Sequence, residues 1–222
     1  SLRPFSPKTT TAGSLVQGLV VFTSDGGHLW GEHGLIDKRC AYEESIRIPL
    51  LASCPGLIPP DSKCSAVVTN IDMAPTFLEL AGIAPSSWMD GRTLVHLLED
   101  PSAGKSDPAT LVYEYYWEPS FPQTPTTFAL RGSQYKLIQY HGLWDTDELY
   151  DINADPLETK NLINDPAQQK RVAQLRRQLY EQLKATNGLA IPMGFKRNHG
   201  SSKRSPDGST RAQFPALTTQ TT

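Results

Sequence analysis

The chain has 222 residues, with 21 lysines and arginines, 23 aspartates and glutamates, and a formal net charge of −2. This balance excludes the basic excess of a nucleic-acid-binding protein, and no apolar run is long enough to span a membrane. The length suffices for one domain with a substantial core, or for a domain and a small partner domain.

Residues 1–14 are polar, with proline and threonine, and predict a disordered leader rather than a secretory signal. The chain begins with Ser1 and not with methionine, so we expect a fragment of a longer protein. The compartment therefore stays undetermined from this end of the sequence.

A first region is predicted over residues 15–104, and it opens with a strand over Leu15–Thr23. The apolar run Leu19–Phe22 is rich in β-branched residues, which is typical of a parallel-sheet strand buried on both faces. The other elements predicted in this region are a second buried strand over Ile46–Ala52, a helix that starts at Asp72, and a helix over Arg92–Leu98.

A second region is predicted over residues 105–188, after a linker rich in serine, glycine and proline. Its predicted strands are Leu111–Trp117, Thr127–Arg131, Tyr135–His141 and Glu148–Asp151. A helix over Pro166–Thr186 carries an apolar stripe made of Val172, Leu175, Leu179 and Leu183. This order predicts an antiparallel sheet covered by a helix, an α+β subdomain, followed by a disordered tail over residues 189–222.

The stretch from Gly18 to Lys38 concentrates the chemistry of the chain. Asp25 follows the first predicted strand directly, and ligands bind beyond the carboxyl ends of strands in open α/β sheets. Four glycines let the backbone of this loop turn tightly, and its titratable side chains are Asp25, His28, Glu32, His33, Asp37 and Lys38. The loop therefore predicts a ligand site, with Asp25 as a helix cap as the alternative.

The same stretch resembles the type I sulfatases of the alkaline phosphatase superfamily. The matching motifs are Thr-Ser-Asp-Gly-Gly-His-Leu-Trp-Gly-Glu-His-Gly-Leu-Ile-Asp-Lys-Arg at 23–39, Tyr-Glu-Glu-Ser-Ile-Arg-Ile-Pro-Leu-Leu at 42–51, Asn-Ile-Asp-Met-Ala-Pro-Thr at 70–76, and Asp-Gly-Arg at 90–92. The resemblance implies an α/β fold, here a partial alkaline-phosphatase-like sheet followed by the small C-terminal subdomain. It also implies a sulfuric ester hydrolase, with a secretory, lysosomal or periplasmic setting.

The resemblance assigns roles to particular residues. Asp25 falls on a metal ligand of the family, whose metal is Ca²⁺, while the next position is Gly26, which has no side-chain donor. Lys38 falls on the lysine that contacts the sulfate, as a catalytic and substrate-binding residue, and His33 and His28 are further substrate-binding candidates. We expect Glu43, Glu44 and Arg47 to form structural ion pairs behind this site.

The nucleophile of the family is a formylglycine made from a Cys/Ser-x-Pro-x-Arg motif, which this sequence does not contain. Ser53-Cys54-Pro55 begins such a motif, but Leu57 stands where arginine is required. We therefore expect this chain to correspond to the C-terminal half of a sulfatase and to be inactive alone. The alternatives are a non-catalytic sulfatase-fold protein that binds a glycan or partner, and a phosphatase or phosphonate hydrolase of the same superfamily.

The expected ligand is a sulfated small molecule or a glycan, and the oligomeric state stays open. Trp117, Trp144 and His141 could form a rim that stacks on a sugar, provided that they are exposed. Arg131 and Tyr135 are expected to pack on the sheet rather than to reach the ligand. For the cysteines, the alternatives are a Cys54–Cys64 pair that leaves Cys40 free, and three buried thiols.

Overall fold

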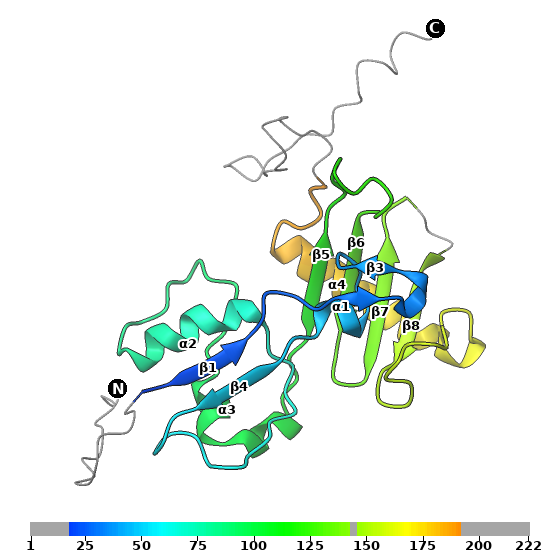
Figure 1. The fold of residues 1–222 in the computed structure, drawn as a ribbon. Coiled ribbons are helices and arrows are strands. Elements are labelled where there is room, and N and C mark those ends of the chain that lie inside the picture. Colours follow the sequence, from blue (N-terminus) through cyan, green and yellow to red (C-terminus); the bar gives the residue numbers. More distant parts are fainter. Residues whose placement is uncertain (1–17, 143–145, 192–222) are drawn as a thin grey trace, which may run out of the picture. The chain divides into compact units, whose positions relative to one another are not determined.

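The computed structural model describes residues 18–142 and 146–191, which form two compact units (Figure 1). The first unit comprises residues 18–28 and Ile46–Leu111, and the second comprises Leu29–Ser45 and the described residues from Val112 onward. The second unit thus includes Leu29–Ser45, which we call the loop segment and which sequence analysis grouped with the first region. Within the described residues, no helix is long and apolar enough to cross a membrane.

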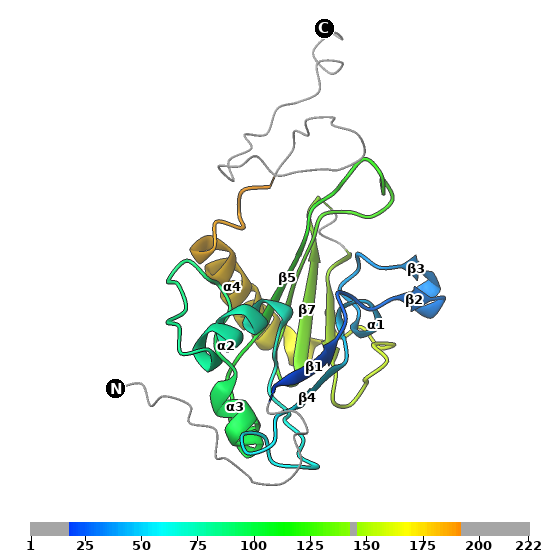
Figure 2. The ribbon, with the colours of Figure 1, turned by 60° about the vertical axis from the view of Figure 1, so that its left-hand side comes forward.

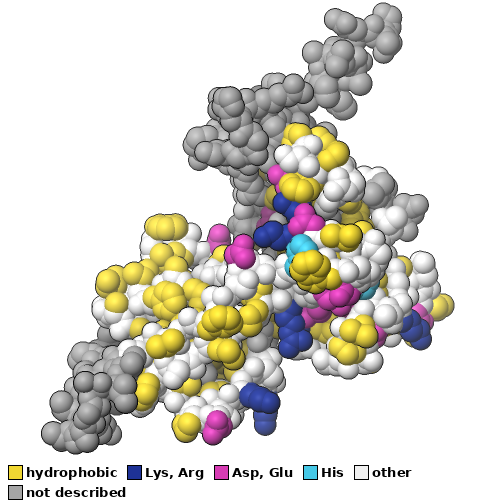
Figure 3. Space-filling view, viewed as in Figure 1, with side chains coloured by type: hydrophobic (Ala, Val, Ile, Leu, Met, Phe, Trp, Pro, Cys, Tyr) yellow, Lys and Arg dark blue, Asp and Glu magenta, His cyan; other side chains and the backbone are white. Residues whose placement is uncertain are grey.

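In the first unit, strand β1 (Val20–Thr23) pairs antiparallel with β4 (Leu50–Ser53) in a two-stranded sheet. The prediction of a strand buried on both faces of a parallel sheet is wrong here, because Val20 is 56% and Phe22 is 63% exposed. An apolar run indicates a preference for burial but does not specify which neighbours cover it. Hydrophobic side chains consequently gather on the visible face of this unit (Figure 3).

The helices of the first unit are arranged around the buried carboxylate of Asp72. It accepts backbone N–H bonds from Thr69 at 2.8 Å and from Arg92 at 2.8 Å. The first of these completes a capping box with Thr69 at the start of η2 and is not a side-chain cap on α2. The helix predicted from Arg92 starts at Val95 instead. The elements are η2 (Asn70–Asp72), α2 (Met73–Leu80), α3 (Val95–Glu99) and η3 (Pro101–Lys105).

The second unit is built on a four-stranded sheet in the order β5-β6-β7-β8. Its strands are β5 (Leu111–Tyr115), β6 (Thr127–Arg131), β7 (Tyr135–Tyr140) and β8 (Glu148–Asp151). The pairs β6–β7 and β7–β8 are antiparallel, as predicted. Helix α4 (Gln169–Ala185), preceded by the turn η5 (Pro166–Gln168), covers one face (Figures 1 and 2).

Alternation along the strands determines what each face of this sheet contacts. Phe128, Leu130 and Leu137 pack with Leu179 and Leu183 of α4 in one buried cluster. The opposite face packs against the loop segment in a second cluster, formed by Ala41, Tyr42, Ala129, Ile138, Tyr150 and Ile152. The loop segment contains β2 (Leu29–Trp30), η1 (Glu32–Gly34), β3 (Ile36–Asp37) and most of α1 (Glu43–Ile46).

All three cysteines are free thiols in this structure. Cys54 is buried, Cys40 is half-buried and Cys64 is exposed, so only one of the three fits the expectation of buried thiols.

Candidate functional site

The predicted site residues are divided between the two units. Asp25 and His28 belong to the first unit, and His33 and Lys38 belong to the loop segment of the second. The structure therefore brings His33 and Lys38 together on one short segment, and it places Asp25 and His28 on the unit that carries β1.

Asp25 is exposed and follows β1 after one intervening residue. The Ser24 hydroxyl donates to Asp25 Oδ1 at 3.5 Å and to the carbonyl of Gly26 at 3.1 Å, which shapes the turn. Calcium takes six to eight oxygen ligands, roughly. Asp25 belongs to no close group of three potential metal ligands among the described residues, and Gly26 offers no side chain. These residues alone do not fit a calcium site.

His33 is held on two sides within the loop segment. Its imidazole stacks on the ring of Tyr42, with the centroids 3.7 Å apart and the planes 7° from parallel. Its Nε2 lies 3.5 Å from Oε2 of Glu44, and its side chain is only 14% exposed. The backbone of His33 is in the left-handed region, with φ of 54°, where side chains are rarely found. His33 therefore forms part of the packed base of the loop segment.

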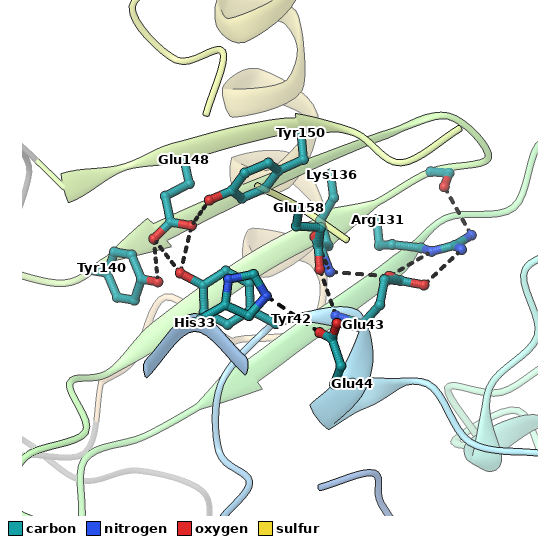
Figure 4. Close-up of polar contacts among 11 residues, drawn as sticks. His33, Tyr42, Glu43, Glu44, Arg131, Lys136, Tyr140, Glu148, Tyr150 and Glu158 are labelled. Atoms are coloured by element: carbon teal, nitrogen blue, oxygen red, sulfur yellow. Dashed lines mark hydrogen bonds and ion pairs between the residues drawn. The ribbon is translucent and has the colours of Figure 1, made fainter. Parts of the chain in front are cut away.

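Tyr42 is fixed in turn by Glu148, which accepts hydrogen bonds from three phenols (Figure 4). We call Glu148, Tyr42, Tyr140 and Tyr150 the tyrosine cradle. The hydroxyls donate at 2.9 Å from Tyr42, 2.8 Å from Tyr140 and 2.6 Å from Tyr150. Burial, together with the nearby charge of Glu148, raises the pKa of all three phenols above the ordinary tyrosine value. The phenols thus remain hydrogen-bond donors at neutral pH.

A second polar group joins the loop segment to the sheet, and we call it the charge cluster: Glu43, Arg131, Lys136 and Glu158 (Figure 4). Lys136 is completely buried, and its Nζ lies 3.1 Å from Oε1 of Glu43 and 2.5 Å from Oε1 of Glu158. Arg131 pairs with the other oxygen of Glu43 at 3.2 Å. The expected ion pairing of Glu43 is confirmed. Arg131, on β6, binds the loop segment through Glu43, so its packing on the sheet stays a prediction. Arg47 is exposed.

The two carboxylates of the charge cluster have opposite pKa shifts. Burial opposes ionisation of Glu43, but Lys136 and Arg131 outweigh it and hold the pKa of Glu43 below its usual value. Burial dominates at Glu158 and raises its pKa, even though Lys136 and the backbone N–H of Glu43 act against this. Lys136 thus acts against the burial penalty at both carboxylates, and at Glu158 it does not outweigh that penalty.

His33, Glu44 and Glu158 form the one close group of potential metal ligands within the described ranges, with ligand atoms within 4.8 Å of one another. A metal is disfavoured there, because the ammonium of Lys136 already lies 2.5 Å from Oε1 of Glu158 and would repel a second cation. The group is better explained as a network that joins the loop segment to the sheet.

Lys38 is exposed and lies between two residues with unusual backbone conformations. Asp37 has φ of 85° and Arg39 has φ of 80°, both in the left-handed region that non-glycine residues seldom adopt. Conformations of this kind persist only where surrounding contacts impose them, and they cluster at functional sites. The geometry therefore singles out the turn that presents Lys38.

Two of the three residues of the predicted sugar-stacking rim, Trp117 and His141, lie within the part of the chain that the structure describes. Trp117 is 38% exposed and donates its indole N–H to the carbonyl of Pro122 at 3.1 Å. The backbone N–H groups of Trp117 and His141 both bind Thr126, each at 2.9 Å, so these two residues are neighbours. Trp144 lies outside the described residues. Tyr135 lies beneath the guanidinium of Arg171, at 3.8 Å, which agrees with packing rather than ligand binding.

The residues that hold the loop segment on the sheet were not predicted from sequence. The signal for Lys136 was present, because the alternation of β7 places this lysine on the face that Ile138 buries. For Glu158 the pattern gave no signal, since it binds the backbone N–H of Glu43 across 115 residues of sequence.

Comparisons with known proteins show the family of this chain. The family model described as "N-sulphoglucosamine sulphohydrolase, C-terminal" matches residues 31–185. An N-acetylglucosamine-6-O-sulfatase from Bacteroides thetaiotaomicron is 36% identical over 170 residues, which are 76% of this chain and 30% of that protein. A choline-sulfatase from Rhizobium meliloti is 34% identical over 151 residues, which are 67% of this chain and 27% of that protein.

The fold agrees with the sequence match. A protein solved in complex with its substrate, D-glucosamine-2-N,6-O-disulfate, has a TM-score of 0.69 at 36% identity, covering 75% of this chain and 34% of that chain. This chain thus spans 27 to 34% of the length of these proteins.

Proposed function

This chain belongs to the type I sulfatase family, and from that premise we propose that it supplies the C-terminal, substrate-binding part of a hydrolase of sulfated sugars. In this proposal Lys38 binds the sulfate group as an ammonium donor. His33, in the same segment, is a further candidate for substrate contact through whatever part of its ring Tyr42 leaves uncovered. In the first unit, His28 is a separate candidate for substrate contact, and Asp25 is a candidate to supply one carboxylate to a Ca²⁺ site whose other ligands this chain has not been shown to contain. Hydrolysis also requires the formylglycine nucleophile of the family, whose motif this sequence lacks.

The observation that supports this proposal most strongly is the presentation of Lys38. The residue is exposed, and left-handed residues flank it on both sides within the segment that the family model covers. A lysine ammonium binds a sulfate oxygen as a compact point charge with three donors. The neighbouring protein that binds a disulfated glucosamine supports an amino sugar as the carrier of the sulfate.

The test is a titration of the full chain with D-glucosamine 6-sulfate, with unsulfated D-glucosamine as the matched ligand. We expect weak, saturable binding of the sulfated sugar, with a Kd on the order of millimolar, and Lys38→Ala should weaken it about tenfold. Lys184→Ala removes an exposed lysine from α4 and should leave the affinity unchanged. Equal binding of both sugars, or equal binding by wild type and Lys38→Ala, would remove Lys38 from the site.

Sulfate release provides the second arm. We expect none from this chain with Ca²⁺, because the nucleophile motif is absent from its sequence. Release of sulfate from D-glucosamine 6-sulfate by the purified chain would refute the requirement for that motif.

A further inference from the structure

Arg39 follows Lys38 in sequence, and its side chain contacts three other protein side chains. Its Nη1 pairs with Oδ2 of Asp37 at 2.5 Å, and its Nε pairs with Oε1 of Glu118 at 3.3 Å. The guanidinium carbon lies 3.3 Å from the ring centroid of Phe121, a cation–π contact. We call Arg39, Asp37, Glu118 and Phe121 the arginine clamp.

The clamp connects the loop segment to the β5–β6 connection, which runs from residue 116 to residue 126. Glu118 and Phe121 are ordered by that connection, since Phe121 donates its N–H to the Glu118 carbonyl at 3.1 Å. The Tyr115 hydroxyl at the end of β5 also donates to Glu118 Oε1, at 3.1 Å. The far side of the clamp is therefore anchored to the sheet, and it can impose a conformation on the loop segment.

Arg39 and Lys38 differ in the charged groups that surround them and in their exposure. The guanidinium is shared by two carboxylates, so the clamp carries one excess negative charge and does not itself attract an anion. Its side chain is 21% exposed, whereas Lys38 is exposed. Arg39 thus serves as a structural cation, and in the proposed function it is Lys38 that contacts the ligand.

We propose that Glu118 and Phe121, acting through Arg39, are positioning residues that hold the Lys38 ammonium in place for a sulfate ester. The contacts stabilise the left-handed conformations of Asp37 and Arg39, on both sides of Lys38, which are unfavourable in a free chain. Without the clamp the turn relaxes, and Lys38 samples orientations in which its ammonium misses the sulfate. This inference rests on the proposed function for the identity of the ligand, but not for the ordering of the turn.

Two variants of the full chain test the clamp. Phe121→Ala removes the cation–π contact without changing charge, and Phe121→Tyr retains the aromatic ring. We expect Phe121→Ala to lower the ¹⁵N heteronuclear NOE of the Lys38 amide in the absence of sugar, and to weaken D-glucosamine 6-sulfate binding roughly threefold to tenfold. Phe121→Tyr should restore both values. The matched control is Tyr135→Ala, which removes the equivalent contact with Arg171 and should alter neither value.

Glu118→Gln distinguishes an electrostatic role of Glu118 from its role in the clamp, because the two predict opposite effects on the affinity for the sulfated sugar. Removing a negative charge near Lys38 would tighten anion binding if only electrostatics mattered, whereas loss of the clamp weakens it. We expect weaker binding. Tighter binding by Glu118→Gln, or an unchanged Lys38 NOE in folded Phe121→Ala, would overturn the clamp. Absence of sugar binding by wild type, with the expected change in the NOE, would overturn the proposed function instead.

Discussion

The buried ammonium of Lys136 offers the sharpest test of how the loop segment is held on the sheet. Lys136→Met keeps the length and apolar stem of the side chain but leaves Glu43 and Glu158 without their shared cation. Removing one partner of a buried ion pair costs about 3–5 kcal/mol. We expect the lower end, about 3 kcal/mol, because Arg131 remains on Glu43 and the Glu43 N–H still binds Glu158 at 2.7 Å.

Differential scanning calorimetry of the full chain measures this loss. About 3 kcal/mol corresponds to a fall in Tm of about 6–12 °C for a protein of this size. The double variant Lys136→Met/Glu158→Gln removes the unpaired charge as well, so it should recover about half of the loss. Lys170→Met, at an exposed position of α4, is the control and should change stability by less than about 0.5 kcal/mol.

The pH dependence of the free energy of unfolding gives an independent check on the role of this ion pair. The pKa of Glu158 is already raised in the folded protein, so its stabilising contribution is present below the unfolded pKa and is lost as the pH rises through the folded value. Lys136→Met should therefore be more damaging near about pH 7 than near about pH 4.5. A variant as stable as wild type at both values, or a double variant less stable than the single one, would refute the reasoning.

Three further changes test other parts of the fold. Glu148→Gln removes the carboxylate that helps to raise the pKa of the cradle tyrosines, so phenolate absorbance should appear at lower pH than in wild type; an unchanged alkaline titration would contradict this. The raised pKa values also mean that the stability given by these phenols is present below about pH 10 and lost above it. Gly91→Ala would place a Cβ 2.1 Å from the Ile71 carbonyl oxygen, so we expect a loss of more than about 2 kcal/mol and faster amide exchange in α2. Leu179→Ala opens the core beneath α4 and should cost about 2–5 kcal/mol by calorimetry, with a smaller loss showing that the helix is packed less tightly than described.

The α+β unit could be predicted from sequence because its signals are local. Alternation fixed the bounds of β6 and β8, and the apolar stripe that includes Val172 and Leu183 identified α4. The sulfatase motifs likewise identified the loop that contains His33 and Lys38. These features depend on residues within a few positions of one another, which is the range over which periodicity and motifs carry information.

The features that could not be predicted from sequence are contacts between residues far apart in the chain. The apolar run of β1 predicts burial, but the structure pairs it with β4 alone and leaves Phe22 exposed. In the arginine clamp, Arg39 and Glu118 are 79 residues apart in sequence. In the charge cluster, Glu43 and Glu158 are 115 residues apart. Contacts at such separations are set by how the sheet brings its connections together, and no local pattern records them.

A structure of the full chain crystallised with D-glucosamine 6-sulfate would examine the central claim most directly. We predict that the sulfate oxygens lie within hydrogen-bond distance of Lys38 Nζ, while Arg39 remains bound to Asp37 and Glu118. A sulfate group bound by Arg39 itself, or bound at a surface that does not include Lys38, would contradict the account.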